Sequence, residues 1–165
     1  MLYIGRRWAV PDVNNSNDLG EVEKKMTGKV TNRTEGMKPP EEGYYSGVIG
    51  TTVTCKIDRP LGSAHPKHPD IIYPVNYGFV PEVFAGDGAE QDVYILGVDK
   101  PLEEFTGKVL AVYHRLNDVE DKWIVVPEGV SFGREEILQK IEFQEKFFEG
   151  ELYMAEKLCE YLNIL

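Results

Sequence analysis

The sequence has little cysteine, no long hydrophobic run and no excess of positive charge. Its two cysteines, Cys55 and Cys159, are far apart and lack the close spacing of metal ligands. We therefore expect two reduced thiols rather than a disulfide. No apolar run approaches the length needed to cross a bilayer, and the N-terminus lacks the apolar stretch of a signal peptide. We expect a cytoplasmic protein without a membrane partner.

The acidic charge is unevenly distributed along the chain. Residues 1–46 contain seven Lys/Arg and seven Asp/Glu, whereas residues 47–165 contain eleven basic and twenty-one acidic residues and so carry the whole net charge of −10. A domain this acidic is a poor partner for nucleic acid. It suits a site that gathers cations before it binds an anion.

The chain is 165 residues long, which is enough for one domain with a hydrophobic core. Residues 1–46 are rich in Asn, Gly, Thr and charged side chains, so we expect an N-terminal arm that is mobile or docked on the surface. We expect the folded domain to span residues 47–165.

Short β-rich segments dominate the first part of this domain. They are expected at about residues 48–58, 71–80, 91–98, 108–115 and 122–127. Glycine, proline and acidic turns separate them, a pattern typical of a small barrel or sandwich. Two C-terminal helices are expected next. The apolar stripe of the first comprises Ile137, Leu138, Ile141 and Phe148, and that of the second comprises Leu152, Ala155, Leu158, Cys159 and Leu162.

Two acidic turns are the main candidates for a functional site. The first places Asp87, Glu90 and Asp92 within six residues, and the second contains Asp118 and Glu120. Hard divalent cations prefer such carboxylate oxygens. Two acidic turns at one end of a barrel would repel each other unless cations lie between them.

A loop with two histidines offers a competing metal site. His65 and His68 are three residues apart, but Pro66 and Pro69 exclude a helix that would place them on one face. We therefore favour anion contacts or solvent exposure for this loop.

Two motifs carry a resemblance to a known family. The chain reads Tyr-Pro-Val-Asn-Tyr-Gly over residues 73–78 and Asp-Gly-Ala-Glu-Gln-Asp over residues 87–92. This order resembles the signature of soluble, Mg-dependent inorganic pyrophosphatases of the OB-barrel type. The runs IDRPLGS and HRLNDVEDKW resemble a compact bacterial branch of that family, and the resemblance covers about residues 47–148.

The resemblance implies a mainly β fold, with an OB-like five-stranded barrel and C-terminal helices packed outside. It implies Mg²⁺, with Mn²⁺ as an alternative, and pyrophosphate or a related small phosphate as the ligand. We also expect a homo-oligomer and no nucleic-acid partner. An OB-fold that binds single strands is disfavoured, because it would need a basic groove with stacking aromatic side chains.

The resemblance also implies roles for individual residues. The expected metal ligands are Asp87, Asp92, Asp118 and Glu120, with Asp121 competing for the last position. The expected phosphate contacts are Lys122 and Tyr77, together with Tyr73, Lys67 and Arg59.

Three departures from the family pattern bear on activity. Ala89 replaces the middle carboxylate of the first turn, which in the family helps to activate water, and we expect Glu90 to act as the substitute base. A Tyr-Lys pair of the family falls at Phe147–Phe148. The arginine before the first tyrosine has no clear match, and His65, Lys67 or Arg59 could stand in for it. The sequence thus predicts hydrolysis of inorganic pyrophosphate to two phosphates. The alternative is a degenerate, non-catalytic member that binds a metal-phosphate ligand or a protein partner.

Overall fold

The computed structural model describes residues 40–41 and 43–155 of the chain. Over this part the elements run in the order β1 (Thr52–Arg59), β2 (Asn76–Phe84), β3 (Glu90–Ile95), β4 (Glu104–Arg115), β5 (Asp121–Val126), α2 (Arg134–Glu145) and β6 (Gly150–Met154). All five expected strands are present, but β1 begins four residues later, β4 four residues earlier and β2 five residues later than the sequence suggests. The backbone of Tyr73 bonds instead with Gly62 and Ser63, in the loop that follows β1.

Five of the strands close into the barrel that the sequence predicts. β1 pairs with β2, β2 with β3, β3 with β5 and β5 with β4, and β4 returns to β1. Every pair in this ring is antiparallel except β3 with β5, which run in the same direction. The parallel register places Val93 opposite Trp123, so the preceding residues, Asp92 and Lys122, also lie side by side.

The strands bury apolar side chains on both faces. On β3, Val93 and Ile95 belong to one buried cluster, whereas Tyr94, together with Leu96 just after the strand, belongs to another. This alternation follows from the two-residue period of a strand, whose successive side chains point to opposite faces. The second cluster also contains Ile137 and Ile141 of α2, so that face of the strands is the one that the helix covers.

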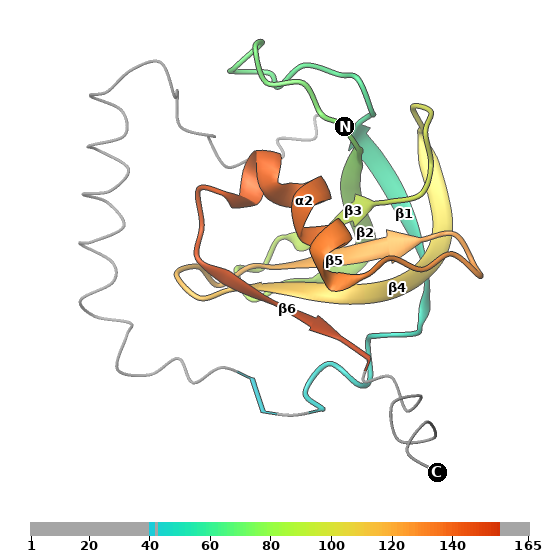
Figure 1. Ribbon diagram of the computed structural model, residues 1–165, viewed down its shortest axis with the longest axis vertical. Coiled ribbons are helices and arrows are strands. Elements are labelled where there is room, and N and C mark those ends of the chain that lie inside the picture. The colour runs from blue at the N-terminus through green and yellow to red at the C-terminus, as the bar shows by residue number, and fades with distance from the viewer. Residues whose placement is uncertain (1–39, 42, 156–165) are drawn as a thin grey trace.

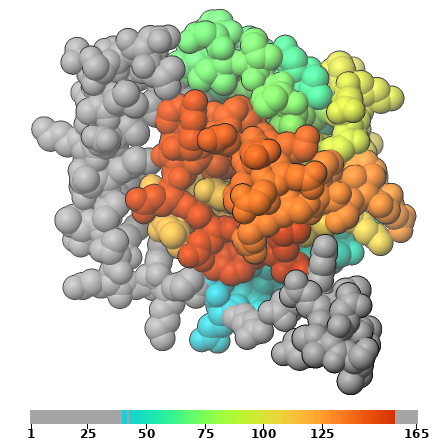
Figure 2. All heavy atoms as spheres, viewed as in Figure 1, coloured from blue at the N-terminus to red at the C-terminus, as the bar shows by residue number. Residues whose placement is uncertain are grey.

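The helix α2 packs across the barrel (Figure 1). Ile137 and Ile141 are four residues apart and fully buried, which confirms these two positions of the expected apolar stripe, and Leu138 packs partly buried beside them. The side chain of Glu136 accepts a hydrogen bond of 2.7 Å from the N–H group of Gly133 and thereby stabilises the start of the helix. Together with residues 146–154, α2 covers the strands on the face seen in Figure 2.

The second C-terminal helix is a wrong prediction for the residues that the structure describes. Residues 150–154 form the strand β6, which pairs with the last part of β4 from Ala111 to Arg115. An unpaired edge of β4 was available to this segment, and pairing there outweighed its helical pattern. Phe148 also lies beyond the end of α2. The remaining positions of the expected second helix, Leu158, Cys159 and Leu162, lie outside the described residues, as do residues 1–39 of the expected arm.

A close approach of two backbones explains Gly78 in β2. A Cβ atom at this position would lie 1.9 Å from the carbonyl oxygen of Lys56 in β1, so no larger residue fits. The glycine lets β1 cross tightly over β2 beside Tyr77.

Within the same cluster as Val93, Cys55 is a buried free thiol, and its burial raises its pKa to about 12. In the described part of the chain, no helix is long and apolar enough to span a membrane.

Candidate active site

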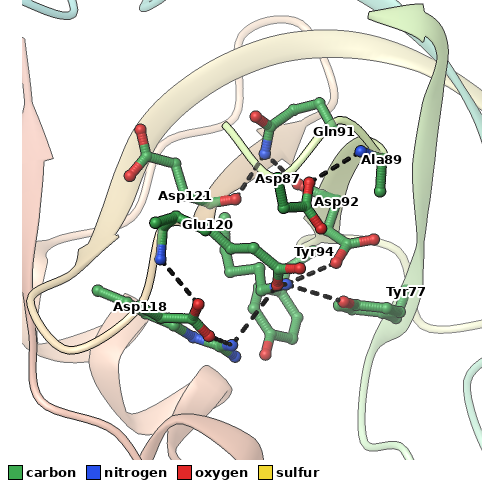
Figure 3. A network of polar contacts seen from close by, with 12 residues as sticks. Tyr77, Asp87, Ala89, Gln91, Asp92, Tyr94, Asp118, Glu120 and Asp121 are labelled. Carbon is green, nitrogen blue, oxygen red and sulfur yellow. Dashed lines mark hydrogen bonds and ion pairs between the residues drawn. The ribbon is translucent and has the colours of Figure 1, made fainter. Parts of the chain in front are cut away.

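A buried lysine lies at the centre of the polar contacts. The Nζ atom of Lys122, on β5, is 2.5 Å from Asp92 Oδ2, 2.7 Å from Glu120 Oε2 and 3.4 Å from the hydroxyl oxygen of Tyr77. The lysine side chain is 0% exposed. Figure 3 shows Asp92, Glu120 and Tyr77 pointing toward this common centre from separate strands and loops.

The strand pairing explains why these residues meet. Asp92 lies beside Lys122 across the parallel pair β3–β5, and Tyr77 on β2 lies opposite Tyr94 on β3. Burial raises the pKa of the Tyr77 hydroxyl well above its ordinary value, and the charge of Asp92 raises it further, while the charge of Arg115 lowers it. The net rise keeps Tyr77 neutral, so that it can donate a hydrogen bond at neutral pH.

A second buried cation, Arg115, ends β4. Its Nε and Nη2 atoms donate to the two carboxylate oxygens of Glu145, each at 2.8 Å, and its guanidinium lies 3.6 Å above the ring centroid of Phe148. Its Nη1 atom lies 3.6 Å from Asp118 Oδ2 and 3.8 Å from Glu120 Oε2. Burial alone would lower the pKa of Arg115, but the hydrogen bonds and charge of Glu145 outweigh it and raise that pKa.

Sequence reasoning missed Arg115, Glu145 and Tyr94, whose hydroxyl donates to Glu145 Oε1 at 2.6 Å. A signal was present for one of them. Ile137, Ile141 and Glu145 follow one another at four-residue spacing, so a carboxylate occupies a position of the buried helical stripe. A charge at such a position requires a buried partner.

Arg59 extends the cluster on the side of Tyr77. Its Nη1 atom donates to the hydroxyl oxygen of Tyr73, and its Cζ atom lies 5.3 Å from the ring centroid of Tyr73 and 5.9 Å from that of Tyr77. Arg59 is 5% exposed. Of the three residues considered for the missing arginine of the family pattern, Arg59 is therefore the one whose side chain contacts both tyrosines.

The first acidic turn contributes to the site unevenly. Asp87 is exposed, and its Oδ1 atom accepts a hydrogen bond of 2.9 Å from the N–H group of Ala89 within the turn. Glu90 is partly buried, and its Oε1 atom accepts one of 3.1 Å from the N–H group of Glu82. Asp92 is the residue of this turn that reaches Lys122.

The contacts of the second turn distinguish Glu120 from Asp121. Glu120 contacts Lys122, whereas Asp121 accepts a hydrogen bond of 2.8 Å from the hydroxyl of Tyr45 and lies 2.7 Å from His114 Nδ1. In β5 the two neighbours Asp121 and Lys122 point to opposite faces. Asp121 therefore belongs to a different cluster.

Lys67 and the two histidines form a separate loop. Lys67 is exposed, and the Nδ1 atom of His65 accepts hydrogen bonds from the backbone N–H groups of Lys67 and His68. These contacts hold the loop in shape. The structure thus brings together Arg59, Tyr73, Tyr77, Asp92, Asp118, Glu120 and Lys122, and leaves Asp87, Glu90 and Lys67 engaged in local contacts.

The carboxylates of the site suit a hard divalent cation in their chemistry. Asp92 and Glu120 converge on one cation, Lys122, and Asp118 approaches another, Arg115. Among the residues that the structure describes, no group of three or more acidic, histidine or cysteine side chains is arranged as a ready metal cage. A metal ion would therefore share these oxygens with the two side-chain cations, and the donor types fit it.

Known proteins resemble this chain in structure. No protein-family model matches it, and no curated protein matches it. The solved structure of an inorganic pyrophosphatase from Neisseria gonorrhoeae superposes with a TM-score of 0.50 at 21% identity, covering 70% of this chain and 89% of that one. An inorganic pyrophosphatase from Ehrlichia chaffeensis superposes with a TM-score of 0.51 at 18% identity, covering 70% and 93%. The chain shares the fold of these two proteins.

Proposed function

We propose that this chain hydrolyses inorganic pyrophosphate to two phosphates in a reaction that depends on a divalent metal. The observation that carries the proposal is the position of Lys122, a fully buried ammonium group between Asp92 and Glu120 with the Tyr77 hydroxyl beside it. A buried cation among carboxylates suits a site that handles a polyanion together with metal ions. The shared fold supports the same conclusion.

The residues that would hold the metal are Asp87, Asp92, Asp118 and Glu120. Mg²⁺ is the expected ion and Mn²⁺ the alternative, because both take carboxylate oxygens. A bound divalent ion would supply positive charge for the diphosphate and for the leaving phosphate. The acidic residues around Lys122 and Arg115 outnumber the two cations, which favours a further cation in this region.

Lys122 and Arg59 would bind phosphoryl oxygens, and Tyr73 would orient Arg59 through their hydrogen bond. Tyr77 stays neutral and donates its hydroxyl proton to a phosphoryl oxygen or to the attacking water. Lys67, on its separate and exposed loop, stays a predicted phosphate contact.

In the hydrolysis step, the oxygen of a water molecule forms a bond to one phosphorus atom while the bond from that phosphorus to the bridging oxygen breaks. The second phosphate leaves with the bridging oxygen. Ala89 has no carboxylate to take the water proton, and Glu90 is the candidate base because it lies two residues before Asp92 on the same strand.

The alternative function is binding without turnover, and two observations favour it. Lys122 and Arg115 already neutralise part of the carboxylate cluster, and Ala89 lacks the acidic group expected at its position. Phosphate release from pyrophosphate, measured on the purified protein with and without Mg²⁺, decides between the two. Metal-dependent release supports the enzyme, whereas phosphate binding without release under Mg²⁺ or Mn²⁺ supports the binder.

A further inference from the structure

One nitrogen of the Arg115 guanidinium is left without a hydrogen bond among the described residues. Nε and Nη2 are satisfied by Glu145, but Nη1 is buried and has no hydrogen-bond acceptor. Its neighbours, Asp118 Oδ2 at 3.6 Å and Glu120 Oε2 at 3.8 Å, lie beyond normal hydrogen-bond length. A buried N–H donor in this state can donate a hydrogen bond to an additional oxygen acceptor.

The orientation of this nitrogen is fixed from two sides. Glu145 accepts two parallel hydrogen bonds from the opposite edge of the guanidinium. The ring centroid of Phe148 lies 3.6 Å from Cζ of Arg115, on one face of the guanidinium. Tyr94 in turn donates to Glu145 and fixes the carboxylate. The unused N–H groups of Nη1 therefore lie toward Asp118 and Glu120, and they cannot turn away unless the two hydrogen bonds with Glu145 break.

The charges at the site determine what the extra partner can be. Arg115 and Lys122 face four carboxylates, those of Asp92, Asp118, Glu120 and Glu145, which leaves a net charge of −2. A free anion is repelled by this excess, but one divalent cation shared by these carboxylates would cancel it. Under that condition an anionic oxygen can approach Nη1.

A groove lies next to the residues that hold Arg115. Glu145 and Phe148 line this groove of about 370 Å³ beside α2, whereas Arg115 itself is fully buried and does not line it.

We propose that Arg115 is a phosphate-binding residue of this site, with Nη1 as the donor to a phosphoryl oxygen and with Glu145 and Phe148 as its positioning residues. The inference rests on the proposed function and deepens it by adding a cation to the substrate contacts. A guanidinium bond to a phosphoryl oxygen is charge-assisted, and it would give Nη1, whose close neighbours are ion-pair partners, the hydrogen bond that it lacks within the described part of the chain.

The test is calorimetric titration of the full-length protein with inorganic phosphate in the presence of Mg²⁺. Arg115→Met should weaken phosphate binding about tenfold or more, the usual worth of one charge-assisted hydrogen bond. Adding Phe148→Lys to that variant should restore much of the affinity, because the ring of Phe148 already touches the guanidinium and an ammonium group there can reach the same space. Lys108→Met removes a charge from an exposed pair with Glu128 and should leave phosphate binding unchanged.

Two results would overturn the inference: phosphate affinity that is unchanged in Arg115→Met, or a loss that Phe148→Lys does not restore, which indicates a purely structural role. If Arg115→Met does not fold, Arg115→Lys carries the test, because it keeps the charge and loses the unused Nη1. A reduced phosphate affinity with a wild-type unfolding midpoint supports the inference, and an unchanged affinity overturns it.

The same titrations separate this inference from the proposed function. If the wild type binds phosphate through Arg115 but releases none from pyrophosphate, the proposed hydrolysis is wrong and the binding role of Arg115 stands. If the wild type hydrolyses pyrophosphate and Arg115→Lys has unaltered phosphate affinity, the proposed hydrolysis stands and the binding role is wrong. Wild-type protein that binds no phosphate under Mg²⁺ overturns the role of Arg115.

Discussion

The Nζ atom of Lys122 lies 2.5 Å from Asp92 Oδ2 across the parallel strands β3 and β5, and the two side chains differ sharply in exposure. Lys122 is 0% exposed and Asp92 is 27% exposed, so the carboxylate separates the ammonium group from solvent. A buried ammonium group is stable only while its partners remain in place. Lys122 is therefore a counter-ion that holds together the carboxylates of Asp92 on β3 and of Glu120 in the turn before β5.

Replacing Lys122 tests this counter-ion role. Lys122→Met should lower the free energy of unfolding by about 3–5 kcal/mol, the usual cost of leaving buried charges unpaired. Urea denaturation measures the change. The control is Lys108→Met, whose exposed pair with Glu128 should contribute no more than about 0.5 kcal/mol. Equal unfolding midpoints for the two variants would contradict the counter-ion role.

Divalent metal should stabilise the native protein. Because the carboxylates exceed the cations at the site, Mg²⁺ or Mn²⁺ bound to the native state should raise the melting temperature with concentration. Asp92→Asn should reduce this rise, since it removes an expected ligand. Asp121→Asn is the matched control, because Asp121 contacts Tyr45 and His114 instead of Lys122. A melting curve that neither ion moves would exclude a shared metal site.

The substitute base is tested at Glu90. Glu90→Gln should lower turnover of pyrophosphate by roughly 10²–10⁴-fold, the usual contribution of a general base. The amide oxygen can still accept the hydrogen bond from Glu82, so the fold should persist. Glu128→Gln neutralises an exposed carboxylate and serves as the control.

A related variant, Ala89→Asp, returns a carboxylate to the middle of the first acidic turn. It should raise turnover if the other ligands are in place. Full activity of Glu90→Gln would assign proton removal to another group. Activity that appears only in Ala89→Asp would favour the binding alternative for the natural chain.

The buried tyrosines predict loss of stability at high pH. Burial raises the pKa of Tyr77 and of Tyr94 well above the ordinary value, so both are neutral in the native state and ionise more readily when unfolded. Their contribution is complete below the unfolded pKa, about 10, and is lost as the pH rises through the higher folded value. Tyrosinate absorbance should therefore rise together with the loss of native circular dichroism. Tyr94→Phe should flatten this dependence, whereas Tyr44→Phe, at a 70% exposed position, should not.

The N-terminal segment should be dispensable for folding. We expect a chain that lacks residues 1–40 to unfold cooperatively, because the barrel and α2 are built from residues beyond 51. This chain keeps Tyr45, whose ring is buried and whose hydroxyl bonds to Asp121. An insoluble product, or one without a cooperative transition, would show that residues 1–40 belong to the core.

The sequence predicts local features of this protein well. Alternation through Val93 and Ile95 marks β3, and the acidic turns mark the strand ends from which Asp92 and Glu120 extend. These signals lie in residues that are close together in the sequence. An alternation of apolar residues every second position, or a cluster of acidic residues, can be recognised before the fold is known.

The features that the sequence did not reveal depend on long-range pairing. Arg115 bonds to Glu145, which lies thirty residues further along the chain, and no local sequence pattern identifies the two residues as partners. The strand β6 was mistaken for a helix because its pairing with β4 depends on an edge that only the closed barrel provides. In residues 150–154, pairing with the available edge of β4 decided the secondary structure, and the helical spacing of the apolar residues did not.

The long strand β4 has a consequence for the order in which the protein assembles. One of its edges is shared, with β1 along Glu104–Lys108 and β6 along Ala111–Arg115. During synthesis the first of these pairings can form while the second still lacks its partner, because Glu145 and β6 are synthesised after β1 to β5. We therefore expect the barrel to close before Glu145 fixes Arg115, and the Arg115 side of the charged site to reach its native arrangement after the barrel.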